Sequence, residues 1–135
     1  MKRSNASCTF HKEVIVTRIN VGIQPHELSR QHLLAEHREI KRIPNCIVSG
    51  RFTLKGQPAE FKLGPGHVKF FYTRLGYLKK RYELVYAECI SRGYNVTYYG
   101  GAWTGVPEEL MGDYTPTKHD RSLLLARIAE RTSSK

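Results

Sequence analysis

The chain has 135 residues, of which 40% are hydrophobic and 25% charged, and its formal net charge is +10. This length and composition predict one globular domain with one core and exclude a disordered chain. No apolar run approaches the roughly 20 residues of a membrane-spanning helix, so we expect no membrane partner. The excess of positive charge favours nucleic acid or another polyanion as the partner.

The first predicted helix covers residues 25–41, because Pro25 suits the first helical turn, where no backbone donor is needed. At about 100° per residue, its polar side chains fall within an arc of roughly 120°. This polar face comprises Gln31, His32, Arg38, Glu39 and Arg42. Leu33 and Ile40 lie towards the other side. We expect the Pro44-Asn45 pair to end this helix.

The glycines and proline of residues 46–62 predict a loop or a weak hairpin. A second, longer helix is predicted from His67 to Arg92, and Gly93 is placed to end it in the left-handed conformation. Apolar residues follow its three- and four-residue steps along one face, which we assign to the core. This face comprises Val68, Phe71, Leu75, Leu78, Tyr82, Val85 and Cys89.

Residues 94–111 are irregular and aromatic, and Pro107-Glu108-Glu109 is expected to open a single helical turn. A third helix is predicted from Asp120, as its cap, through Arg131, with Leu124 and Ile128 facing inward. The sequence therefore predicts an all-α fold: a single compact domain of three main helices with long irregular connections.

The cysteines and histidines do not form a recognisable metal site. The three cysteines are widely spaced and odd in number, so we expect no structural disulfide and a reducing, cytoplasmic compartment. His32 and His37 are five residues apart, on different sides of a helix, and no cysteine or paired carboxylate supports them. We therefore expect neither a metal nor another cofactor.

Several blocks of the chain together resemble a known family. They are Thr17-Arg18-Ile19-Asn20, Gln31-His32-Leu33-Leu34-Ala35-Glu36-His37-Arg38-Glu39, Gly64-Pro65-Gly66-His67-Val68-Lys69-Phe70-Phe71-Tyr72, Ala87-Glu88-Cys89 and Arg92-Gly93. In this order and spacing, they resemble the phage-type pyrimidine-dimer DNA glycosylases with abasic-site lyase activity. The resemblance covers roughly residues 17–42 and 61–94, whereas residues 43–60 and the end of the chain match poorly.

The resemblance implies a mechanism in which the amine of a terminal threonine, here Thr17, attacks C1′ of the 5′ nucleotide of a pyrimidine dimer. A free α-amine has a pKa of about 7.7–8.0, so a useful fraction is neutral at physiological pH. The resulting imine leads to β-elimination on the 3′ side. Glu39 matches the essential glutamate of the family, which stabilises the cationic sugar and transfers protons.

The same resemblance implies that a monomer binds damaged double-stranded DNA, bends it and extrudes a nucleotide. Arg18, Arg38 and Arg42 match arginines around the target phosphates, and His32 is expected near the substrate sugar or phosphate. Arg127 and Arg131 match basic residues near the DNA backbone. The imine supplies the electron sink, so the family's chemistry needs no metal.

Thr17 carries a free amine only if the mature chain begins there. Lys12-Glu13-Val14 can be encoded by a purine run of the kind that bacterial ribosomes bind, and Val16 by GTG, an alternative start codon. The inserted methionine is normally trimmed before threonine. We therefore expect residues 1–16 to be a leader or a disordered extension, and residues 17–135 to form the glycosylase/lyase domain. A genuine basic extension, starting at Met1, is the alternative.

Other functions stay open at this point. With Thr17 internal, the chain would be a non-catalytic basic DNA-binding protein, or its Met1 amine would do the chemistry; an RNA- or ribosome-associated protein fits the charge as well. The chain also lacks the aromatic, basic tail with which the family often ends, so an abasic-site lyase without dimer specificity is a further alternative. The aromatic residues of the segment 98–103 are candidates to replace that tail.

Overall fold

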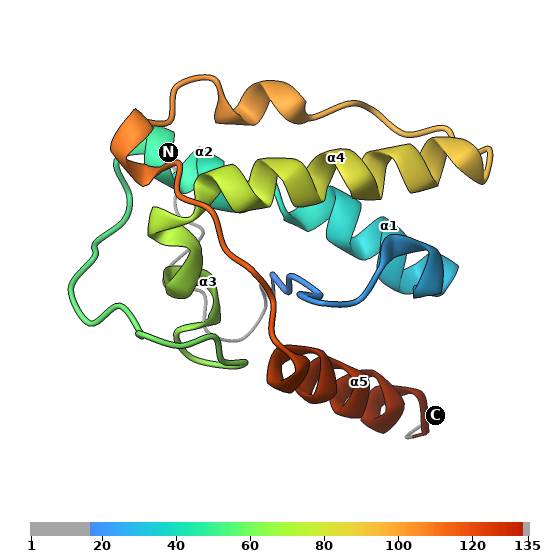
Figure 1. The fold of residues 1–135 in the computed structure, drawn as a ribbon. Helices are drawn as coiled ribbons and strands as arrows, with labels where there is room; N and C mark the ends of the chain where they lie inside the picture. Colours follow the sequence, from blue (N-terminus) through green and yellow to red (C-terminus); the bar gives the residue numbers. More distant parts are fainter. Residues whose placement is uncertain (1–16, 134–135) are drawn as a thin grey trace.

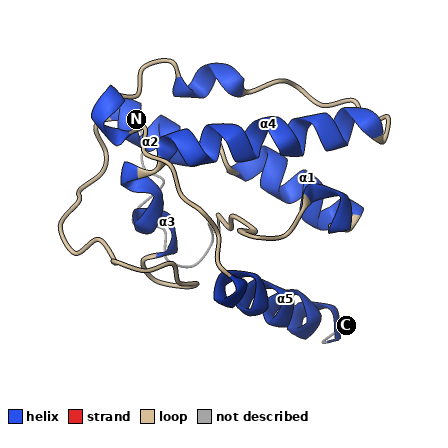
Figure 2. Cartoon of the chain, viewed as in Figure 1, coloured by secondary structure: helices blue, strands red, loops and turns tan. Residues whose placement is uncertain are grey.

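The computed structural model describes residues 17–133, with the side chains of residues 17–129. Figure 1 shows the arrangement of its helices, and within the described range no β-strand is present (Figure 2). The α-helices are α1 (Arg30–Glu39), α2 (Arg42–Ser49), α3 (His67–Phe70), α4 (Leu75–Ser91) and α5 (Lys118–Ser133). The described range also contains four short 3-10 helices: Pro25–Glu27 precedes α1, and Phe71–Thr73, Gly100–Trp103 and Glu108–Leu110 lie between later α-helices. The predicted all-α class is confirmed.

The first predicted helix is divided in the structure. A 3-10 turn at Pro25–Glu27 comes first, and α1 then begins after Ser29, whose Oγ accepts the backbone N–H of His32 at 3.2 Å. The prediction that Pro44 ends a helix is wrong. Pro44 lies in the first turn of α2, where backbone N–H groups have no partner within the helix, so the missing N–H of proline costs no hydrogen bond. Residues 46–49 are therefore helical rather than part of a loop.

The second predicted helix is interrupted at its start. It consists of α3, a 3-10 turn at Phe71–Thr73 and α4. The chain around Gly112 crosses at this point: Gly112 accepts the N–H of Tyr77 at 3.0 Å and donates its own N–H to Thr73 at 3.2 Å. A side chain at Gly76 would meet the Met111 carbonyl at 2.5 Å. Because of this close crossing, the helix is interrupted between α3 and α4. No local sequence pattern indicates the interruption.

The core is built on the face of α4 that the sequence predicts, and α1 packs against α4 (Figure 1). Six of the seven predicted core residues are fully buried, while Val68 is half-buried against the core. The segment before α1 joins this core through Ile19, Val21 and Ile23, which expose 1% or less of their surface. The first described residues are thus part of the core and do not lie on the surface.

Helix α5 begins one residue after Thr117, which caps it in place of the predicted Asp120. The Oγ1 of Thr117 accepts the N–H of Asp120 at 3.0 Å, and Asp120 Oδ2 accepts the N–H of Thr117 at 3.0 Å. Arg121 joins α5 to the N-terminal segment, because it donates to the Gly22 carbonyl at 3.0 Å and pairs with Glu27 at 2.7 Å. Leu124 is buried and Ile128 half-buried, as predicted.

Of the two cysteines in the described range, Cys89 on α4 is a buried free thiol. The expectation of no structural disulfide stays a prediction, because Cys8 lies outside the described residues. None of the described helices is long and apolar enough to cross a membrane.

Candidate functional site

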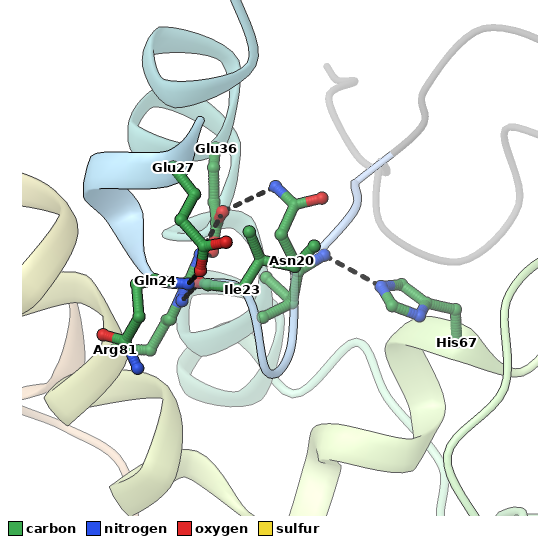
Figure 3. Close-up of polar contacts among 8 residues, drawn as sticks. Asn20, Ile23, Gln24, Glu27, Glu36, His67 and Arg81 are labelled. Carbon is green, nitrogen blue, oxygen red and sulfur yellow. Dashed lines mark hydrogen bonds and ion pairs between the residues drawn. The ribbon is translucent and has the colours of Figure 1, made fainter. Parts of the chain in front are cut away.

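The segment Thr17–Asn20 is held by two buried side chains from different helices (Figure 3). The N–H of Ile19 donates to Nε2 of His67 at 2.9 Å, and Nδ2 of Asn20 donates to Oε1 of Glu36 at 2.7 Å. Thr17 itself is buried, with 8% of its surface exposed. The segment therefore enters the core along a defined path.

Glu36 is in turn bound by Arg81 of α4. The guanidinium reaches the two oxygens of Glu36 at 2.7 and 2.9 Å and also donates to the carbonyl of Ile23 (Figure 3). Burial disfavours the charge of Arg81, but the charge and hydrogen bonds of Glu36 outweigh it and raise the pKa of Arg81. Through Asn20 and the Ile23 carbonyl, this ion pair holds the part of the N-terminal segment that is farther along the chain from Thr17.

His67 binds through both ring nitrogens. Its Nε2 accepts from Ile19, so the ring proton lies on Nδ1, which donates to the Lys62 carbonyl at 2.9 Å. Burial lowers the pKa of His67 to about 4, against the effect of the hydrogen bond to Lys62. The charges of Arg18 and Arg127 lower this pKa further, whereas Glu36 raises it. Arg127 of α5 thus lies within electrostatic reach of His67.

Thr17 lies beside the junction of α1 and α2. There, Arg42 donates from Nη1 to the Thr17 hydroxyl over a long 3.4 Å contact. Glu39, the last residue of α1, is paired with Arg38 at 3.4 Å; 18% of the Glu39 side chain and 58% of the Arg38 side chain are exposed. The junction therefore combines a half-buried carboxylate with two arginines, one of which contacts Thr17. Such a carboxylate can stabilise a nearby cation or accept a proton, and the guanidinium groups can bind phosphate.

His32 lies at the other end of α1. It lies seven positions before Glu39, or about 10 Å along the helix. Its Nδ1 lies 2.8 Å from the hydroxyl of Ser29, which caps the helix. The structure therefore places His32 in the first turn of α1.

The remaining predicted residues occupy different surroundings. Arg127 is half-buried on α5, and the side chain of Arg131 lies outside the described part. Trp103 is a core residue, since its Nε1 donates to the Leu75 carbonyl at 3.1 Å and only 4% of it is exposed. Tyr99 packs on His37 with ring centroids 5.1 Å apart, whereas Tyr98 is 47% exposed. Tyr98 is thus the most exposed of these three aromatic residues, and Tyr99 is half-buried.

Sequence reasoning missed the buried residues that hold the N-terminal segment: Asn20, Glu36, His67 and Arg81. One signal was present, because Glu36 is spaced three residues after Leu33 and four before Ile40, on the apolar side of the helix. A carboxylate on an apolar face needs a buried partner. The identity of that partner depends on the fold, since Arg81 lies on another helix.

A family model for pyrimidine dimer DNA glycosylases matches residues 16–98, which is more than half of the chain. The matched range contains the junction residues Arg38, Glu39 and Arg42, as well as Thr17 and His67. It confirms the resemblance identified in the sequence. The chain therefore belongs to the pyrimidine dimer DNA glycosylase family.

Proposed function

We propose that this protein repairs ultraviolet-damaged DNA as a pyrimidine-dimer glycosylase with abasic-site lyase activity, and that the α-amine of Thr17 is its nucleophile. The observation that supports this proposal most directly is the position of Thr17. It contacts Arg42 beside the α1–α2 junction, where Glu39 ends α1. A nucleophile, a carboxylate and phosphate-binding groups are thereby gathered in one region, as such a reaction requires.

In the proposed reaction, the lone pair of the neutral amine forms a bond to C1′, and the glycosidic bond breaks with its electron pair leaving on the pyrimidine. Opening of the sugar ring and loss of a proton from nitrogen give the imine. The imine acidifies the C2′ proton, whose removal forms the C2′–C3′ double bond as the bond from C3′ to the 3′ phosphate oxygen breaks. Glu39 stabilises the cationic sugar and transfers protons.

Binding in this proposal depends on the basic residues around the site. Arg18, Arg38 and Arg42 contact target phosphates, His32 lies near a sugar or phosphate farther along α1, and Arg127 with Arg131 follows the DNA backbone. Extrusion of a nucleotide gives access to C1′, and damage lowers the cost of unstacking. The protein acts as a monomer, without metal or other cofactor. A cytoplasmic location stays a prediction.

The free amine requires that residues 1–16 be absent from the active protein. Their structure lies outside the described residues, so this boundary is a proposal that rests on the coding argument and on the chemistry. Intact mass of the protein expressed from its natural coding region reads the first residue directly. A mass that begins at Thr17 supports the proposal, and a retained Met1 contradicts it.

Borohydride trapping tests the function itself. The full chain and the chain beginning at Thr17 are each mixed with a duplex that carries one cyclobutane thymine dimer, and the adduct is mapped. We expect an adduct at Thr17 in the short form only. An adduct at another residue, or with both forms, would assign the chemistry to another amine or indicate processing of the full chain.

A second candidate is an abasic-site lyase without dimer specificity. The burial of Trp103 favours it, because one of the aromatic residues that might replace the missing C-terminal tail is committed to the core. Trapping on an abasic duplex, with none on the dimer duplex, would select this candidate. No adduct on either DNA would leave a non-catalytic basic DNA-binding protein.

A further inference from the structure

We infer that His67 is a positioning residue for the amine of Thr17: its ring holds the backbone at Ile19 and so fixes Thr17 beside Arg42. This inference rests on the proposed function, in which that amine is the nucleophile. His67 does not touch the reacting atoms in this proposal. It acts through the chain from Ile19 to Thr17, which are separated by Arg18 alone.

The hydrogen bond is built to fix the segment. His67 is 5% exposed, and both of its nitrogens are engaged, by Ile19 and by the Lys62 carbonyl at 2.9 Å each. Two phenylalanine rings meet the imidazole edge-on, Phe61 with centroids 5.3 Å apart and Phe71 with centroids 5.5 Å apart. The ring therefore cannot rotate without losing hydrogen bonds and packing together.

The hydrogen bond from Ile19 to His67 is close enough in the chain to constrain the position of Thr17. It joins the backbone of residues 17–19 to another element, whereas the contacts of Asn20 and Ile23 hold the chain farther from Thr17. Thr17 is itself contacted by Arg42 at 3.4 Å, through its side-chain hydroxyl and not through its backbone. An attacking nitrogen must lie within about 3.5 Å of carbon, and a shift of about 1 Å can slow such a reaction by about 100-fold.

Two amide substitutions separate the roles of the ring nitrogens. The amide of a glutamine reaches the position of Nε2, so His67→Gln can still accept from Ile19. The amide of an asparagine ends near Nδ1, so His67→Asn can donate to Lys62 but cannot reach Ile19. Both side chains are neutral and polar, and both leave a comparable hole around Phe61 and Phe71. A purely structural role would affect the two variants alike.

The experiment uses the protein expressed from its natural coding region, with three readouts. Amide hydrogen exchange at Ile19 reports the hydrogen bond itself. Single-turnover borohydride trapping on a duplex with one abasic site reports amine attack, and the Kd for a duplex with a tetrahydrofuran abasic analogue reports binding. We expect His67→Asn to lose protection at Ile19 and to be trapped about 10- to 100-fold more slowly with Kd unchanged, and His67→Gln to restore both within about threefold.

The outcomes distinguish this inference from the function on which it rests. If the unaltered protein is trapped but His67→Asn is trapped equally fast after losing protection at Ile19, the positioning role is wrong and the lyase stands. Equal slowing of the two variants, or a matching loss in Kd, also overturns it, because either result indicates general damage to the fold. If the unaltered protein forms no adduct, the proposed lyase and the positioning role both fail.

Discussion

The guanidinium of Arg81 and the carboxylate of Glu36 form a two-pronged ion pair between α4 and α1, with 5% and 0% of their side chains exposed. Taking two charges out of water is costly, and the pair is tolerated because each member satisfies the other and also holds a part of the N-terminal segment. The structural consequence is that two hydrogen bonds of the N-terminal segment, at Asn20 and at the Ile23 carbonyl, both depend on one buried charge pair.

Removing one member of this pair is expected to be severe. Arg81→Met leaves Glu36 buried without its cation, which should lower the free energy of unfolding by about 3–5 kcal/mol in urea denaturation. The double variant Glu36→Met/Arg81→Met should be less destabilised than Arg81→Met alone, because no charge stays unpaired. Lys80→Met, which breaks the exposed pair with Asp113, is the control and should leave the urea midpoint unchanged. A mild effect of Arg81→Met would contradict the buried-charge argument.

Stability should also depend on pH through His67. Its pKa is about 4 in the folded protein and near 6.5 when unfolded, so between these values the unfolded chain binds more protons. Stability is therefore fully present above about pH 6.5 and falls with decreasing pH, by about 1.4 kcal/mol per pH unit and about 3 kcal/mol in total at pH 4.

The measurement is urea unfolding from pH 4 to pH 7 for the unaltered protein and for His67→Gln. Glutamine does not titrate, so the variant should lose this component of the slope while every other titrating group contributes equally to both proteins. Parallel stability curves would mean that His67 titrates alike in the folded and unfolded states, and the burial argument for its low pKa would fail.

The contrast between α4 and the site shows which features the sequence can specify. The core face of α4 was predictable because its spacing is a local property of one helix. The break before α4 was not, since it depends on the distant carbonyl of Met111 next to Gly76. Likewise, Thr17 and Glu39 were identified through a family resemblance, whereas the pairing of His67 with Ile19 arises only when α3 packs on the N-terminal segment.

Glu39→Gln tests the carboxylate at the end of α1. In the proposed mechanism this carboxylate stabilises the cationic sugar and transfers protons, so its replacement by the neutral amide should reduce strand cleavage by about 100-fold or more. Binding to a tetrahydrofuran-containing duplex should be retained. Glu88→Gln is a close control, because Glu88 also pairs with an arginine and is 22% exposed, against 18% for Glu39. Full cleavage by Glu39→Gln would remove this residue from the mechanism.

Arg42 is expected to have two roles that separate on substitution. Its guanidinium is proposed to bind a target phosphate, so Arg42→Ala should weaken DNA binding and reduce the slope of log K against log salt by about 1. Because Arg42 also contacts the Thr17 hydroxyl, trapping of the bound abasic duplex should slow as well. Arg42→Lys keeps the charge but not the planar fork, so it should retain the salt slope while losing part of the affinity. An unchanged slope in Arg42→Ala, measured by fluorescence anisotropy across a salt series, would show that Arg42 serves the amine and not the phosphate.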